Sequence, residues 1–259
     1  MLLRLAAERA TGALQREPGT LHLVDGQVVH AESPRSPGLD TLLIAQGRLS
    51  QADWDEARAG AGDPHRAAEH LVKNGRLSLG ELELCRLSAL FDAAYFALAP
   101  HGGPTRFRHG TARAGDRPWS VAVQRVIGES LRRRRLLDGL WPGPHLDDRP
   151  LVRRPPAAGQ CVPGRLRAVL ALADGSRTPT DIAGALGRPA FHVLLEVRRL
   201  AVAGLIDPCL PPDPPTGRGD PPSRSLTARP RAPDLVPDDV YAPDIALLRR
   251  VRDALEARL

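Results

Sequence analysis

The side chains best suited to binding chemistry lie in one stretch of the second half of the chain. Guanidinium and imidazole groups donate hydrogen bonds to phosphate oxygens and to the edges of bases, and a hydroxyl can contact a nucleic-acid backbone. Groups of these kinds are carried by Thr180, Arg188, His192, Arg198 and Arg199. Side chains of these types can contact DNA when one helix presents them, so the elements that carry them decide whether they do.

Catalytic chemistry finds little support in the residue patterns. The chain contains no P-loop, no G-x-G-x-x-G, no H-E-x-x-H and no G-x-S-x-G motif. Asp53, Asp55 and Glu56 cluster at an expected helix start, where acids are favoured by the helix dipole. His22 and His30 fit the polar face of strands, since no third metal ligand follows at a suggestive spacing. We therefore expect no enzyme, no metal and no cofactor.

The DNA-binding candidates are expected to lie on a module of three helices. Residues 165–207 carry apolar side chains at helical spacing, interrupted by turns. Thr178 and Asp181 form a capping-box pattern at the second helix, with Pro179 suited to its first position. Gly187 is placed to end that helix, and a third helix is predicted from about 189 to 203.

This order of a capped second helix, a turn, and a longer third helix followed by Gly204-Leu205-Ile206 resembles the winged helix-turn-helix of bacterial transcription regulators. In that family the second helix braces the third, which enters the major groove. Two features favour a module that binds proteins instead. Glu196 lies in the middle of the expected outward face and repels phosphate, and Pro208 shortens the wing.

Composition limits the class of protein. The chain has 259 residues, enough for two small domains, and a formal net charge of +6 that is compatible with nucleic acid. Cys85, Cys161 and Cys209 are widely spaced, as expected in a reducing cytoplasm. The N-terminus is too short and too charged for a signal peptide, and no apolar run reaches membrane length. We expect a cytoplasmic protein that has no membrane partner.

The first half of the chain predicts a small domain of sheet and helices. Asp25-Gly26 between apolar runs indicates a β-hairpin, and residues 106–108 fit an edge strand. The sequence Gly-Arg-Leu-Ser occurs at 47–50 and again at 75–78, each time with an acid three residues after the serine. These repeats predict two helices that begin with capping boxes.

The opening Thr11-Gly12-x-Leu14, the hairpin around Asp25-Gly26 and the repeat at Gly47 and Gly75 resemble the PATAN domain. That resemblance implies a non-catalytic signalling or interaction module joined to other regulatory domains. The alternative to a PATAN domain is a small α+β domain of unrelated origin. A helix expected at 120–140 resembles the last helix of the same family.

The helix expected at 120–140, which we call the connector helix, and the segment from residue 209 onward each leave alternative roles open. The run Arg132 to Arg135 within the connector helix fits either a solvated helix face or phosphate contacts beside the winged helix. Residues 209–240 are rich in proline and predict a disordered linker. The segment 241–259 predicts an amphipathic helix that docks on this chain or on a partner. Its expected contact residues are Ile245, Leu248, Val251 and Leu255.

The expected architecture is α+β, with a small antiparallel sheet and helices in the N-terminal domain and a mainly helical second module. The predicted segments are a PATAN-like interaction domain with the connector helix at 1–140, a linker at 141–163, a winged helix-turn-helix-like module at 164–208, a linker at 209–240 and the helix at 241–259.

The leading functional hypothesis is a DNA-binding transcriptional regulator with a signalling domain. The alternative is a signalling adaptor whose two domains both bind proteins. DNA, a signalling protein and a second copy of the chain are the expected partners.

Overall fold

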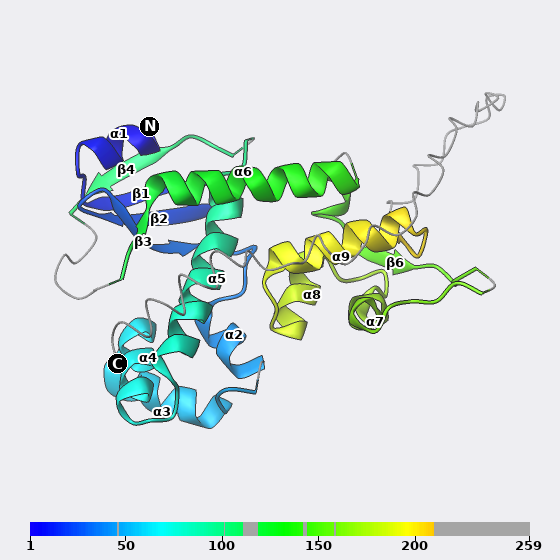
Figure 1. Ribbon diagram of the computed structural model, residues 1–259, viewed down its shortest axis with the longest axis horizontal. Coiled ribbons are helices and arrows are strands. Elements are labelled where there is room, and N and C mark those ends of the chain that lie inside the picture. Colours follow the sequence, from blue (N-terminus) through cyan, green and yellow to red (C-terminus); the bar gives the residue numbers. More distant parts are fainter. Residues whose placement is uncertain (46, 101, 111–118, 142–143, 158, 210–259) are drawn as a thin grey trace, which may run out of the picture. The chain divides into compact units, whose positions relative to one another are not determined.

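The first three strands form a meander whose second turn follows directly from the sequence. Asp25 and Gly26 take φ values of 48° and 74°, as a two-residue hairpin turn requires, so the predicted hairpin is confirmed. The edge strand expected at 106–108 is also present. The computed structural model contains one five-stranded antiparallel sheet of order β4-β1-β2-β3-β5 (Figure 1). Its strands are β1 (Gly12–Arg16), β2 (Gly19–Val24), β3 (Gln27–Glu32), β4 (Arg106–His109) and β5 (Val121–Ala122).

The structure describes residues 1–209 except 46, 101, 111–118, 142–143 and 158. The described residues 1–209 form one compact unit. The predicted linker from residue 210 onward and the predicted helix at 241–259 lie outside the described residues. The expected partner contacts Ile245, Leu248, Val251 and Leu255 therefore also lie outside them.

Three of the described helices on the N-terminal side begin at a side-chain cap. Ser78 and Glu81 form the predicted capping box, each satisfying a backbone N–H of the other residue. Ser50 caps its helix by accepting from the N–H of Asp53, whose carboxylate accepts from the Ser50 hydroxyl instead of completing the box. The helices are α1 (Leu2–Ala7), α2 (Leu39–Ala45), α3 (Gln51–Ala61), α4 (Pro64–Lys73) and α5 (Leu79–Ala97).

Helix α5 connects the apolar cores of the unit. Near its start, Leu82 and Cys85 pack into a helical core around Trp54. Midway along it, Leu90 is buried beneath the sheet. Near its end, Phe96 joins the core of the second module. Figure 1 shows α5 running from the α3–α4 end toward the strands. One helix therefore holds sheet, helical bundle and second module together.

The second module contains the predicted three helices. They are α7 (Gly164–Leu172), α8 (Pro179–Leu186) and α9 (Ala190–Val202), preceded by α6 (Val123–Leu140). Part of the predicted linker at 141–163 is structured, which corrects that expectation. It contains a short 3-10 helix, η1 (Pro144–Leu146), and β6 (Leu151–Arg153), which pairs antiparallel with β7 (Ile206–Pro208). Leu146 and Leu151 are buried in the module's core because the apolar cluster around α9 extends to them.

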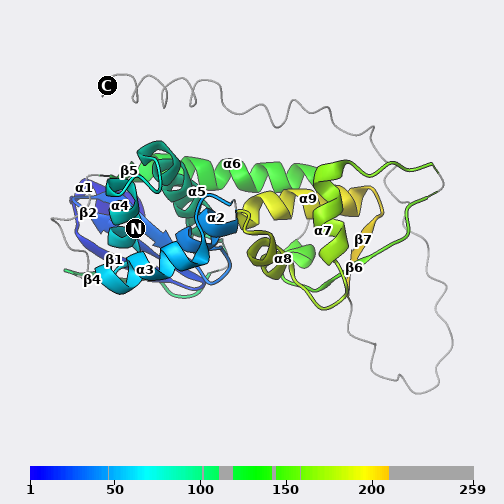
Figure 2. The same cartoon turned by 90° about the horizontal axis from the view of Figure 1, so that it is seen from below.

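The connector helix and the third module helix lie side by side. Figures 1 and 2 both show α9 along α6, and residues of the two helices contact each other along the junction. Phe96 of α5 and Leu137 of α6 belong to the same apolar core as Phe191 and Leu194 of α9. The mixed α+β class is confirmed, and α9 is positioned by both parts of the unit.

Candidate functional site

The second module helix begins as the sequence predicts. Thr178 Oγ1 accepts from the N–H of Asp181 at 3.2 Å, and Asp181 Oδ2 accepts from the N–H of Thr178 at 2.9 Å. Hydrogen bonds from the Thr178 side chain and backbone lower the pKa of Asp181. Gly187 ends the helix with φ of 57°, a left-handed conformation that glycine adopts readily. The predicted cap and stop are confirmed.

The third helix, α9, receives its cap from a distant element. Pro189 occupies the N-cap position and supplies no side-chain hydrogen bond. Asp92 of α5 accepts instead, from the N–H of Ala190 at 2.7 Å and from that of Phe191 at 2.9 Å. Asp92 is 1% exposed, and burial raises its pKa while the N–H of Phe191 and the charge of Arg133 act in the opposite direction. This carboxylate occupies the helix N-terminus that would otherwise attract an anion.

Arg133 of α6 completes the charge balance around that cap. Its Nη1 lies 3.5 Å from Asp92 Oδ1, and its Nε donates to Glu129 Oε1 at 2.8 Å. The guanidinium also lies 4.6 Å from the centre of the Phe191 ring, within cation–π range. Burial opposes ionisation of Glu129, but hydrogen bonds from Arg132 and Arg133 outweigh it and lower the Glu129 pKa.

The arginine run 132–135 is divided between two environments. Arg133 is 7% exposed, and Arg134 Nη2 donates to the carbonyls of Tyr95 at 3.2 Å and Leu98 at 2.5 Å. Successive helical residues are rotated about the axis, so the two inner members of the run reach α5 while Arg132 and Arg135 stay exposed. Arg133 and Arg134 therefore contact α5 and its C-terminal end, which corrects the solvated-face prediction for these two, whereas Arg132 and Arg135 fit it.

Glu196 is not on an outward face, which corrects the prediction. It is 1% exposed and receives two hydrogen bonds from Arg188, at 2.8 and 2.6 Å. Paired, bidentate geometry of this kind is what allows a carboxylate to be buried. Arg188 thereby serves to neutralise an internal acid.

Arg198 is likewise an internal residue. It is 2% exposed, and its Nη2 donates to both carboxylate oxygens of Asp147, at 2.9 and 2.7 Å. Its Nη1 donates to the carbonyls of Leu137 at 3.1 Å and Trp141 at 2.6 Å, at the C-terminal end of α6. Burial raises the pKa of Asp147, and Arg198 opposes that shift. Arg198 thus fixes α9 to the end of α6 and to the turn after η1.

The remaining candidates are partly buried. Thr180 lies in the first turn of α8, and Arg199 lies on α9 beside the buried Arg198. Burial, and next the charges of Arg133 and Arg188, lower the pKa of His192 to about 4. The structure brings Arg188, His192 and Arg133 together at the start of α9, but the five predicted DNA contacts do not form one exposed surface.

Sequence reasoning missed the residues that join α9 to the rest of the unit, namely Asp92, Arg133 and Asp147. One signal was present for Asp92, because it interrupts the apolar stretch from Ala89 to Ala97. Acids in such positions are rarely buried unless they are paired. The sequence does not indicate that the partner is a backbone 98 residues away.

Among the described residues, no helix is long and apolar enough to cross a membrane. In that same part of the chain, no group of three or more His, Cys, Asp or Glu side chains could hold a metal ion. No protein-family model, curated protein or solved structure matches this chain.

Proposed function

We propose that this chain is a regulatory adaptor that acts through protein contacts, with its three-helix module held as a structural part of the interaction unit. The observation that supports this most strongly is the burial of α9. Ten of its 13 residues are buried, including Glu196 and Arg198. A helix that reads the major groove needs a free face near its N-terminus, whereas this N-terminus is capped by Asp92.

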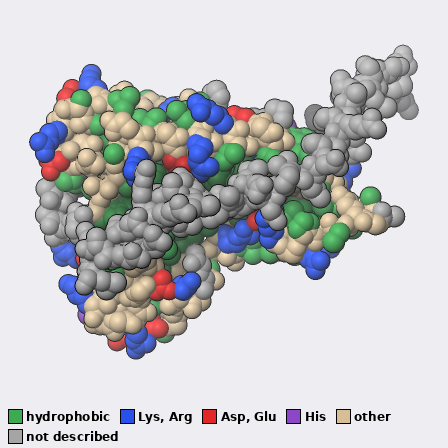
Figure 3. Space-filling view, in the orientation of Figure 1, with side chains coloured by type: hydrophobic (Ala, Val, Ile, Leu, Met, Phe, Trp, Pro, Cys, Tyr) green, Lys and Arg blue, Asp and Glu red, His purple; other side chains and the backbone are tan. Residues whose placement is uncertain are grey.

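The distribution of charge supports the same proposal. Arg133 and Arg198 are almost fully buried, so the formal charge of +6 overstates the positive charge available to a nucleic acid. On the face that Figure 3 shows, basic side chains lie at several separate places with acidic ones between them. DNA binding of useful strength usually needs a continuous basic patch or stripe.

The test is affinity purification of the tagged full-length chain from its native cells after nuclease treatment. Each captured protein is then purified, and its binding is remeasured by calorimetry in the absence of nucleic acid. We expect at least one direct protein complex. Capture of nucleic acid together with failure of every purified protein to bind would overturn the proposal.

A DNA-binding transcriptional regulator is the second candidate, and one observation favours it. Strand β7 follows α9, as the start of a wing would, and pairs with β6, at whose end Arg153 and Arg154 are exposed. In this alternative, α9 separates from α5 and α6 before binding. Thr180, Arg188, His192, Arg198 and Arg199 would then contact DNA.

A mobility-shift assay at low salt distinguishes the two candidates, because phosphate attraction is strongest there. The adaptor proposal expects no sequence-dependent shift with the wild-type chain or with Asp92→Ala, which removes the cap of α9. A shift by wild type would favour the regulator. A shift by Asp92→Ala alone would mean that the second module binds DNA only after release.

A further inference from the structure

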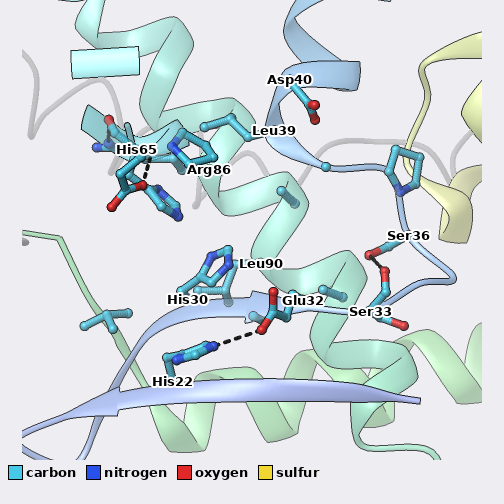
Figure 4. Close-up of a pocket in the computed structure, with 18 of the residues that line it drawn as sticks. His22, His30, Glu32, Ser33, Ser36, Leu39, Asp40, His65, Arg86 and Leu90 are labelled. Carbon is cyan, nitrogen blue, oxygen red and sulfur yellow. Dashed lines mark hydrogen bonds and ion pairs between the residues drawn. The ribbon is translucent and has the colours of Figure 1, made fainter. Parts of the chain in front are cut away.

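A cavity lies between the sheet and the helices of the N-terminal side, away from α9. Its volume is about 480 Å³, within the range of pockets that hold small organic ligands. Strands β2 and β3, the start of α2, and helices α4 and α5 supply lining side chains (Figure 4). Its apolar wall includes Val29, Ala31 and Leu90, all of which are buried.

Three imidazoles stand in a row along this cavity. The ring centres of His22 and His30 lie 5.4 Å apart, and those of His30 and His65 lie 4.6 Å apart. Figure 4 shows His22 and His30 on the strand side and His65 on the helical side. Because three polar rings from separate elements converge on one space, the lining combines apolar surface with hydrogen-bonding groups, as small-molecule sites do.

Arg86 of α5 supplies a cationic group in the same lining. Its side chain is 10% exposed, and Nη2 donates to the His65 carbonyl at 3.2 Å and to Glu69 Oε1 at 3.0 Å. Its Nε is buried and has no hydrogen-bond partner within the described chain. A buried donor without an acceptor is unfavourable, so Glu69 and the His65 carbonyl do not satisfy the whole guanidinium.

Three acids of the lining already have internal partners. Glu32 accepts from His22 Nε2 at 3.1 Å, and Glu69 is paired with Arg86. Asp63 accepts from the N–H of His65 at 2.8 Å, as the cap of α4. Each of these three carboxylates therefore already accepts a hydrogen bond from the protein, and Arg86 keeps donors that Glu69 does not use. Asp40 and Arg58 also line the cavity.

We propose that this cavity binds a small organic carboxylate, with its acid group on Arg86 and its apolar part against Leu90 and Val29. A guanidinium holds carboxylates through charge-assisted hydrogen bonds, and the apolar wall selects for a hydrophobic body. The proposal goes beyond the adaptor function and does not depend on it. Such a site would make the N-terminal side a receptor for a metabolite as well as an interaction module.

The experiment measures binding of benzoate, phenylacetate and octanoate to the full-length chain by calorimetry and saturation-transfer NMR. Benzamide and phenylacetamide are matched probes that lack the charge. We expect at least one carboxylate to bind about tenfold more tightly than its amide. If no carboxylate binds, or if an amide binds as tightly as its acid, the proposal is overturned.

Two variants locate the binding. Arg86→Gln removes the cation, and Ala89→Leu fills the cavity from α5 without changing charge. Each should weaken carboxylate binding about tenfold or more. Arg125→Gln, at an exposed position of α6, is the matched control and should bind as wild type does. If Arg86→Gln does not fold, Ala89→Leu decides. Unchanged affinity in a folded Ala89→Leu chain would place the ligand elsewhere and refute the site.

Discussion

Two adjacent helices of the second module have their N-termini satisfied in opposite ways. Helix α8 is capped by Thr178 and Asp181, which are three residues apart. Helix α9 begins after Pro189 and is capped by Asp92, which is 98 residues from Ala190. The first cap belongs to the helix itself, whereas the second forms only when α5 and α9 are packed together. A local cap stabilises one helix, and a distant cap also couples two parts of the unit.

The surroundings of the two caps differ for the same reason. Thr178 and Asp181 lie near the surface, where water compensates for any lost hydrogen bond. Asp92 is almost fully buried beside Arg133, so removing either partner leaves a charge with little solvation. The distant cap should therefore be much more sensitive to substitution than the local one.

The largest effect is expected for Asp92→Ala. It leaves two N–H groups of α9 unsatisfied and Arg133 with one fewer acidic partner. The free energy of unfolding should fall by about 3–5 kcal/mol, measured by denaturant titration with tryptophan fluorescence. Asp92→Asn keeps an acceptor and should lose less. If Asp92→Ala lowers the free energy of unfolding by less than about 1 kcal/mol, the distant cap stabilises the chain no more than the local one.

A second, smaller effect is expected for the buried ion pair of Arg188 and Glu196. Arg188→Met leaves the Glu196 carboxylate buried without its bidentate partner. The free energy of unfolding should fall by about 2–3 kcal/mol, while Arg188→Met with Glu196→Leu should recover most of that loss. Additive effects in this double-mutant cycle would contradict the inferred coupling.

The third prediction concerns pH. The pKa of His192 is lowered to about 4 in the folded chain, mainly by burial and then by Arg133 and Arg188. The unfolded value is about 6.5, so between these values the unfolded state binds more protons and stability falls as pH falls. The loss should reach about 2 kcal/mol by pH 4, after allowance for partial exposure of the ring.

His192→Gln tests this dependence because glutamine does not titrate. The pH dependence of the variant should lack the part of the loss between about pH 6.5 and 4 that His192 contributes. Stability is compared by denaturant titration at each pH. If the free energy of unfolding changes with pH by the same amount in both chains, His192 is protonated in the folded state as readily as in the unfolded state.

The smallest effect is expected at the local cap. Thr178→Ala removes the acceptor for the N–H of Asp181 and should lower the free energy of unfolding by about 1 kcal/mol. Thr178→Ser keeps the hydroxyl and serves as the control. Hydrogen exchange should quicken at the start of α8 without change at the start of α9. Faster exchange at both helices would mean that the caps are coupled.

Much of the local structure could be predicted because its causes lie within a few residues. Asp25-Gly26 adopts positive φ, Ser78 and Glu81 cap α5, and Gly187 ends α8, all as expected. The roles of Glu196 and of Arg133 could not be predicted in this way. Helical periodicity separates the faces of one helix, but it does not reveal that a second helix covers the polar face as well.

The sequence alone determined the mixed class, the hairpin, the three-helix order and the helix starts, because turn chemistry, capping and hydrophobic spacing act locally. Only the tertiary structure decided whether the charged side chains of α9 face solvent. That outcome depends on Asp92 and Asp147 reaching α9 from distant parts of the chain. Such pairing follows from the packing of α5 and α6 against α9, which residue spacing within α9 does not encode.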